Sequence, residues 1–158
     1  MRLQGDWREQ DVVQCGAFNM TADRRWALQV ALVGRLEGLL AGQGINGADV
    51  VVFDHVPSEP PRLHVRIDGF AAFPRPLAVG RRALHTFTVH VFDENTGAET
   101  SIGTKEIARL QAIADLGLMD WVPLSGATAI QHVSSYSAPD ENPLTQHGVS
   151  KFTTYIGE

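Results

Sequence analysis

The clearest alternation of apolar and polar residues runs along residues 81–91. Its apolar positions share one face of an extended chain and its polar positions share the other, with Phe87, Val89 and Val91 set against Thr86, Thr88 and His90. A period of two is typical of a strand with one buried face. The polar run 93–95 then ends the strand, and Thr96 with Glu99 fits a capping box that begins a helix. We therefore expect a central strand that leads directly into a helix.

Two segments repeat apolar residues at helical spacing. Residues 22–41 carry a leucine stripe with Thr21 as a candidate N-cap, and the stripe includes Leu28, Leu32, Leu36 and Leu39. Residues 97–116 place Ile107, Leu110 and Ala114 on one face. Each stripe should pack on a sheet, and we expect Trp26 of the first helix to lie in the core.

The remaining apolar patterns predict strands. They fall at residues 49–55, 62–70, 127–137 and 148–156. In the second of these, Leu63, Val65 and Ile67 should face inward, while Arg62, His64, Arg66 and Asp68 should face outward. The sum is an α+β fold, with a mostly antiparallel sheet of about four to five strands and two helices packed on one face. Residues 21–158 form one domain after an extension at 1–20.

Prolines interrupt the strand pattern at residues 71–80. Pro74 and Pro76 should rule out regular pairing, so this segment is expected to protrude as a loop or a loosened hairpin. It would hold Phe73, Arg75 and Leu77 in exposed positions. Exposed apolar residues on a stiff loop are typical of a contact with a partner.

Residues 1–20 have no sustained period. They mix apolar residues such as Trp7 and Phe18 with acidic ones. Two interpretations stay open. The segment is a flexible leader, with Met20 as the true start, or it is an arm that docks on a neighbouring subunit through Trp7 and Phe18.

Composition and charge narrow the classes of function. The 158 residues suit one domain, and the formal net charge is −5. A protein that grips nucleic acid normally needs a basic face, so tight DNA binding is disfavoured. No apolar run is long enough to span a membrane, and no secretion signal is indicated. The single Cys15 cannot form an internal disulfide, which suits a reducing compartment at synthesis.

No catalytic, metal or cofactor motif emerges from the spacing of reactive residues. His85 and His90 are five apart on a strand and so should face opposite ways, and no metal-ligand spacing occurs among the six histidines. The run 93–97 lacks the ligands of a calcium loop. We therefore expect no metal, no cofactor and no enzymatic activity.

Four stretches carry a resemblance to a known family. They are ALQVALVGRL at 27–36, VFDHVP at 52–57, LHTFTVHVF at 84–92 followed by Gly97 and its helix, and TQHGVSKF at 145–152. Together with the order of elements, they make the chain similar to the tail terminators, the tail-completion proteins of long-tailed phages and gene-transfer particles. The resemblance spans residues 20–158. Residues 1–20 and the Pro-Leu element within 138–146 depart from the family pattern.

The resemblance implies a structural role in a virion, at the junction of head and tail, after synthesis in the host cytoplasm. Such proteins form a homohexameric ring that caps the tail tube protein, ends its polymerisation and meets the head-completion protein. Double-stranded DNA passes through the central hole without specific binding, and no membrane is involved. The residues that we expect at subunit or partner contacts are Trp7, Phe18, Phe73, Arg75, Leu77, Arg81, Asp93, Glu94, Asp140 and Glu141.

Two other classes stay open. One is another ring-forming head–tail connector or neck protein. The other is a small α+β enzyme or ligand-binding domain, with a site on the open face of the sheet near His64, Arg66 and His90. That second class requires a deep pocket between convergent polar groups.

Overall fold

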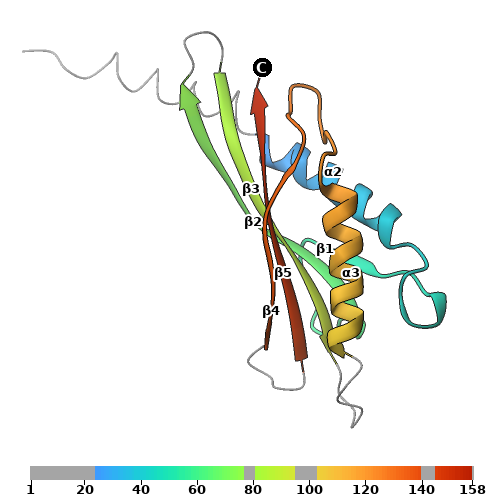
Figure 1. Cartoon of the computed structure of the whole chain (residues 1–158). Helices are drawn as coiled ribbons and strands as arrows, with labels where there is room; N and C mark the ends of the chain where they lie inside the picture. The colour runs from blue at the N-terminus through green and yellow to red at the C-terminus, as the bar shows by residue number, and fades with distance from the viewer. Residues whose placement is uncertain (1–23, 77–80, 95–102, 140–144, 158) are drawn as a thin grey trace, which may run out of the picture.

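In the part of the chain that the structure describes, the fold is a five-stranded sheet with two helices on one face, as the sequence predicts. The computed structural model describes residues 24–76, 81–94, 103–139 and 145–157. The sheet has the order β1-β2-β3-β5-β4, in which β1 runs parallel to β2 and the other neighbours are antiparallel (Figure 1). In chain order the elements are α2 (Arg25–Leu40), a short 3-10 turn (Ile45–Gly47), β1 (Val51–Phe53), β2 (Leu63–Pro76), β3 (Arg81–Glu94), α3 (Gly103–Leu118), β4 (Gln131–Pro139) and β5 (Thr145–Gly157).

The alternation expected in the central strand is confirmed. Phe87, Val89 and Val91 of β3 are buried in the core, while the residues between them are only half-buried. The strand pairs along its whole length with β2 on one side and β5 on the other. The proposed capping box of Thr96 and Glu99 lies outside the described residues, as does Thr21.

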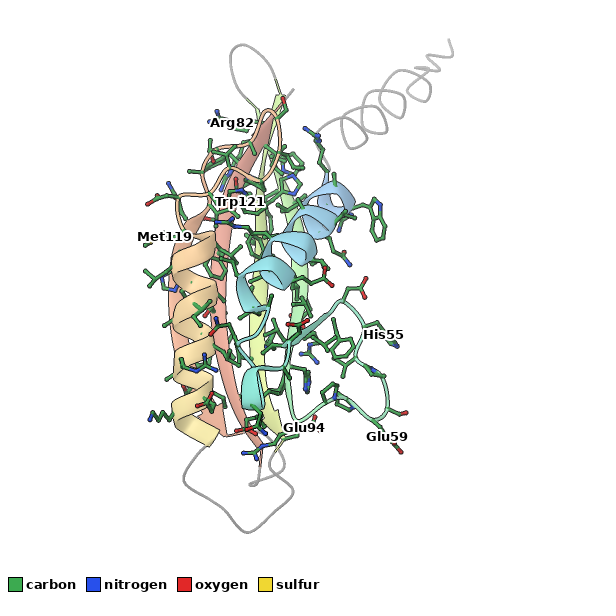
Figure 2. The ribbon with its side chains drawn as sticks, turned by 90° about the vertical axis from the view of Figure 1, so that its right-hand side faces the viewer. His55, Glu59, Arg82, Glu94, Met119 and Trp121 are labelled. Carbon is green, nitrogen blue, oxygen red and sulfur yellow. The ribbon has the colours of Figure 1, made fainter. Side chains whose placement is uncertain are left out.

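The core fills the space between the helices and one face of the sheet. The leucine stripe of α2 is buried throughout, at Leu28, Leu32, Leu36 and Leu40, and α3 adds Ile107, Leu110, Ala114 and Leu118. Both helices lie side by side on this face (Figure 2). The prediction that Trp26 lies in the core is wrong, since 71% of it is exposed. It stands two residues before Leu28, which turns it about 200° around the helix and away from the stripe.

Strand β2 continues through the prolines that were expected to end it. Pro74 and Pro76 pair in register with Ala83 and Arg81 of β3, so the expectation that they rule out regular pairing is wrong, and the segment belongs to a long, regularly paired hairpin. The two prolines are two residues apart, and their missing N–H groups therefore lie on the same side of the strand. Among the described residues no strand lies beside β2 on that side, because β1 pairs with β2 only at residues 64–66. Proline is tolerated at such an edge.

Both edges of the sheet are interrupted by bulges. On β2 the register shifts between Asp68 and Ala71, where Gly69 has a positive φ of 65°. On the outer strand β4 it shifts between His132 and Ser134 and leaves Val133 as the extra residue. Bulges and prolines at sheet edges discourage pairing with a strand of another molecule.

Candidate functional site: the open face of the sheet

The face of the sheet that points away from α2 and α3 carries the main cluster of reactive side chains. We call it the open face; its described residues include Arg66, Asp68, His90, His147, Lys151 and Tyr155. Alternation along each strand places them there, since their neighbours in sequence point into the core. No described helix packs against this face (Figure 2).

Three of these residues form a continuous hydrogen-bonded relay across three strands. His90 Nε2 lies 2.7 Å from Asp68 Oδ1, and His90 Nδ1 lies 2.6 Å from His147 Nε2. An ionised carboxylate only accepts, so the Nε2–H of His90 donates to Asp68. When both rings are neutral, His90 Nδ1 is therefore an acceptor, and the Nε2–H of His147 donates to it.

The relay can hold one extra proton but not two. The contact between the two histidines needs a single proton, which either nitrogen can carry. If one ring becomes an imidazolium, one proton still lies between the nitrogens and the contact persists. If both become imidazolium, two N–H groups point at each other and the contact must open.

The surroundings of His90 favour its neutral form. Burial lowers the pKa of His90, and the nearby Arg66 and Lys151 act in the same direction, although the carboxylate of Asp68 opposes them. Arg66 also forms an ion pair with Asp68, at 2.8 Å. This pair partly neutralises the carboxylate charge of Asp68, which would otherwise stabilise a protonated His90.

Next to the relay, aromatic rings stack into a column. Phe92 lies between His147 and His64, with ring centroids 4.4 Å and 5.0 Å away, and Arg66 lies over its ring. His64 is only 1% exposed, which contradicts the expectation that it faces solvent. It does lie on the open face, but Phe92 and Phe53 cover it, and its Nδ1–H donates to the carbonyl of Pro61. Burial lowers the pKa of His64 as well.

Further along the open face, cationic side chains lie over aromatic rings. The guanidinium of Arg82 is 5.4 Å from the ring centre of Tyr155, and the ammonium of Lys151 is 6.0 Å from that of Tyr136. These contacts keep the cations flat against the sheet. The face is thus a broad surface of stacked rings and charges.

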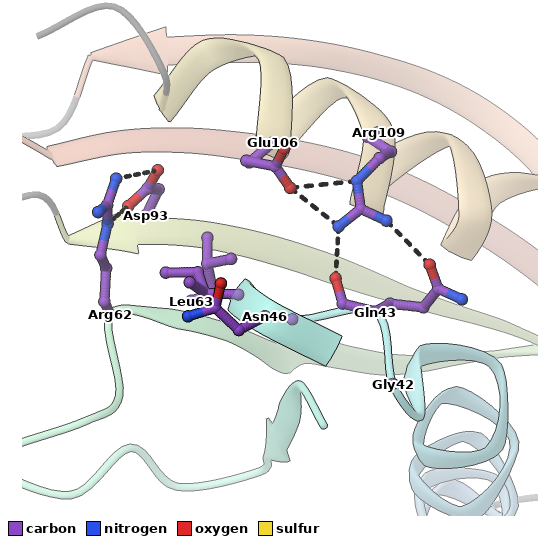
Figure 3. A pocket seen from close by; sticks show the side chains of 10 residues that line it. Gly42, Gln43, Asn46, Arg62, Leu63, Asp93, Glu106 and Arg109 are labelled. Atoms are coloured by element: carbon purple, nitrogen blue, oxygen red, sulfur yellow. Dashed lines mark hydrogen bonds and ion pairs between the residues drawn. The ribbon is translucent and has the colours of Figure 1, made fainter. Parts of the chain in front are cut away.

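A second polar cluster lines a hollow of about 530 Å³ between the loop after α2, the start of β2 and α3 (Figure 3). Arg62 Nε donates to Asp93 Oδ1 at 2.6 Å, and Arg109 binds Glu106 together with the side chain and backbone of Gln43. Each guanidinium is matched by a carboxylate, so this hollow has no excess charge with which to hold an ionic ligand. Its contacts fasten the loop to α3.

Neither cluster resembles a metal centre. Within residues 24–76, 81–94, 103–139 and 145–157, no group of three or more His, Cys, Asp or Glu side chains is arranged to hold a metal ion. As expected from their spacing, His85 is buried in the core and His90 lies on the opposite face.

The contact residues expected from the sequence fall in different places. Phe73 and Arg75 are exposed on the hairpin, and Glu94 is half-buried at the end of β3. Asp93 is only 1% exposed and is paired with Arg62 of its own chain, so it offers little surface to a partner. Arg81 is described only in its backbone, which pairs with Pro76. Outside the described residues lie Trp7, Phe18, Leu77, Asp140 and Glu141.

Two features of the surface are absent from the sequence prediction. The pairing of His90 with His147 joins residues 57 positions apart, and it follows only from the register of β3 with β5. The second feature is the exposure of Trp26 and Val30. The spacing of the leucines in α2 could have shown it, since both residues lie away from the buried leucine stripe.

Comparison with known proteins gives a likeness of fold. No family model matches the chain, and no curated protein matches its sequence. Eighteen chains of solved structures match it. One belongs to the structure described as "Virion of native gene transfer agent (GTA) particle" and superposes with a TM-score of 0.66 at 19% identity, over 84% of this chain and 96% of that chain. In the described part of this chain, no helix is long and apolar enough to cross a membrane.

Proposed function

We propose that this chain is a structural protein of a virion, and more specifically a tail terminator. The observation that carries the proposal is the fold likeness, which covers 96% of a chain from a gene transfer agent virion and leaves little of that chain unmatched. The fold likeness favours a structural protein of a virion. The narrower assignment to the tail terminators comes from the resemblance of sequence stretches, among them those in the first helix, the central strand and β5.

In this proposal the chain forms a homohexameric ring at the end of the tail tube. The ring ends polymerisation of the tube protein and presents a surface to the head-completion protein, at the junction of head and tail. The broad open face and the projecting β2–β3 hairpin support a contact function, because both offer area rather than a deep site. The role requires no cofactor and no catalysis.

The β2–β3 hairpin is the part that we assign to the tube or head partner. Phe73 is large, apolar and exposed, and Arg75 is exposed two residues further along the same strand. Residues of these two types are enriched in protein interfaces.

DNA passes through the ring in this proposal without being held by it. The chain has a net charge of −5, and the open-face cations Arg82 and Lys151 lie over aromatic rings. An acidic wall repels phosphates. We expect no retardation of double-stranded DNA in a gel-shift titration at about 150 mM salt, where nonspecific binding of a basic protein is still detectable.

The decisive experiment measures copy number and tube growth together. The full chain is mixed with the tail tube protein of the same particle, and the species are followed by native mass spectrometry and electron microscopy. Rings of six copies and tubes of arrested length are expected. A compact monomer that leaves tube growth unchanged would falsify the proposal, and six copies that bind only the head-completion protein would move the chain to the neck.

A variant of the hairpin locates the contact. Phe73→Ser should keep the fold and the copy number but weaken the arrest of tube growth or the binding of the head-completion protein. Its matched control is Val51→Ser, which removes an exposed apolar residue from β1. Equal loss in both variants would argue that the hairpin has no special part in the contact.

A further inference from the structure

Large exposed apolar residues gather on two opposite sides of the helical layer. On one side, Trp26 and Val30 project from α2. On the other, Leu116 projects from α3 and Met119 from the turn directly after it, followed by Val122 in the next loop and Val133 in the bulge of β4. Met119 points away from the molecule on the side of α3 opposite α2 (Figure 2). We call these sets the α2-side patch and the α3-side patch.

The side chains of both patches are largely exposed to solvent. Trp26 is 71% exposed, Leu116 is 70% exposed and Val133 is 58% exposed. The elements that carry the α3-side patch are tied together, since Ser135 of β4 donates to Asp115 of α3 and Asp120 N–H donates to the carbonyl of Ile130. Large exposed apolar residues gathered on one side of a molecule are typical of an interaction site.

We propose that the two patches bind each other between copies of this chain, the α2-side patch of one subunit against the α3-side patch of the next. The inference rests on the proposed ring and names the contact that builds it. Because the two patches differ, the contact is heterologous, and repetition of a heterologous contact closes into a ring when the rotation allows.

The charges around the two patches are complementary. Arg25 stands next to Trp26 and lines a hollow together with it, whereas the exposed Asp120 stands next to Met119. Opposite charges around an apolar centre fix the register of an interface and disfavour contact of like patches.

Shape supports the same pairing. A shallow hollow of about 400 Å³ lies beside Trp26 and is lined by Arg25, Gln29 and Phe70 as well. An unbranched side chain such as Met119 can fill a hollow of irregular outline. The free strand edges of β2 and β4 are interrupted by bulges and prolines, so side chains rather than paired strands must join the copies.

Cross-linking tests the contact directly. In a Cys15→Ser background, the double variant Val30→Cys with Met119→Cys should give, on oxidation, a ladder of cross-linked species that ends at the closed ring. Either single variant should stay uncross-linked, and a mixture of the two should stop at dimers. Ser58→Cys with Met119→Cys is the control, since Ser58 is exposed in the loop before β2.

Three results would overturn this pairing. Cross-linking of Val30→Cys to itself would mean that α2 meets α2 across a two-fold axis. Absence of a ladder from rings of six copies would mean that the ring uses other surfaces, and the proposed function would then stand without this contact. A chain that is monomeric both alone and with the tube protein overturns both.

A substitution measures how much the contact contributes. Trp26→Ser should raise the concentration for half-maximal ring assembly at least about tenfold, as truncation of a central interface tryptophan typically does. Ile45→Ser, which removes an exposed apolar residue from the turn after α2, is the matched control and should change it little. Equal assembly of Trp26→Ser and the parent chain would contradict the proposal, even where rings form.

Discussion

At the scale of single residues, burial decides how the ionisable groups behave. Asp68, His90 and His147 are adjacent because β2, β3 and β5 are neighbouring strands. Both hydrogen bonds of His90 are short, 2.7 Å to Asp68 and 2.6 Å to His147. Asp93 is more deeply buried and depends on one guanidinium, that of Arg62. These two arrangements make different predictions, one for pH and one for substitution.

Acid should weaken the fold through the histidines. Burial lowers the pKa of His90 and of His64 below the ordinary value of 6.5 in the folded chain, whereas the unfolded chain titrates near that value. As pH falls below about 6.5, the unfolded state binds protons first, so the free energy of unfolding declines; above 6.5 the full contribution is present. Urea unfolding midpoints at pH 7.5 and 5.5 measure this decline.

A variant separates the relay from general acid effects. His90→Gln should make the decline between these two pH values shallower. His55→Gln, which removes an exposed histidine from the loop before β2, serves as the matched control. A parent chain whose midpoint rises on acidification would contradict the assignment.

The pair of Arg62 and Asp93 should respond unequally to loss of either partner. The side chain of Asp93 has no exposed surface, whereas Arg62 is partly exposed. Arg62→Met leaves a buried carboxylate without its main partner and should cost about 3–5 kcal/mol of unfolding free energy. Asp93→Asn leaves a solvated guanidinium and should cost only about 1–2 kcal/mol. Chemical denaturation of both variants checks the order, and equal costs would be inconsistent with it.

At the scale of elements, the alternation of buried and exposed residues along a strand was predictable, whereas the pairing at the edge of the sheet was not. Val65, Ile67, Phe87 and Val89 lie in the core as their spacing indicates, because a period of two depends only on the strand itself. Pro74 can pair with β3 because no described strand lies on the other side of β2 at this position. The order of strands in a sheet cannot be predicted from the residues of one strand, so this pairing was not predictable. The position of His64 under Phe92 and Phe53 depends on tertiary packing in the same way.

The packing of α2 against α3 makes a prediction about two glycines. A Cβ on Gly117 would lie 2.7 Å from Cδ2 of Leu39, whereas one on Gly34 would meet nothing within 4 Å. Gly34→Ala should therefore stabilise the fold by about 0.5–1 kcal/mol through helix propensity. In Gly117→Ala the overpacking offsets that gain and should give a net loss of up to about 2 kcal/mol. Thermal unfolding of the pair measures the difference, and a gain in both variants would show that Leu39 moves freely.

At the scale of the whole molecule, the candidate site is a set of surfaces rather than a pocket. The helical layer carries apolar patches on two sides, and the opposite face of the sheet carries stacked rings and cations. The leucine stripe of α2 predicted its buried side correctly, but the expectation that Trp26 also lies in the core was wrong. The positions of Trp26 and Met119 on different sides of the helical layer required the fold, since Trp26 lies on α2 and Met119 follows the last residue of α3.

Assembly should be visible in tryptophan fluorescence. Of the three tryptophans, Trp26 is exposed, whereas Trp121 packs against the core beneath Arg35. Burial of Trp26 in the proposed contact should shift emission to shorter wavelength as the protein concentration rises through the assembly range. Trp26→Phe should abolish most of this shift, and Trp121→Phe should retain it. A shift that survives in Trp26→Phe would assign the change to another tryptophan.

The bulges and prolines at the edges of the sheet also affect whether the chain aggregates before it assembles. In the proposed role, this chain is present beside tube subunits that polymerise readily. An edge of unbroken strand would let unassembled copies start ordered aggregates of their own, whereas the bulge at Gly69 and the prolines that follow deny an incoming strand a continuous row of partners. In that role, the irregular edge keeps a protein that ends tube growth from starting an assembly of its own.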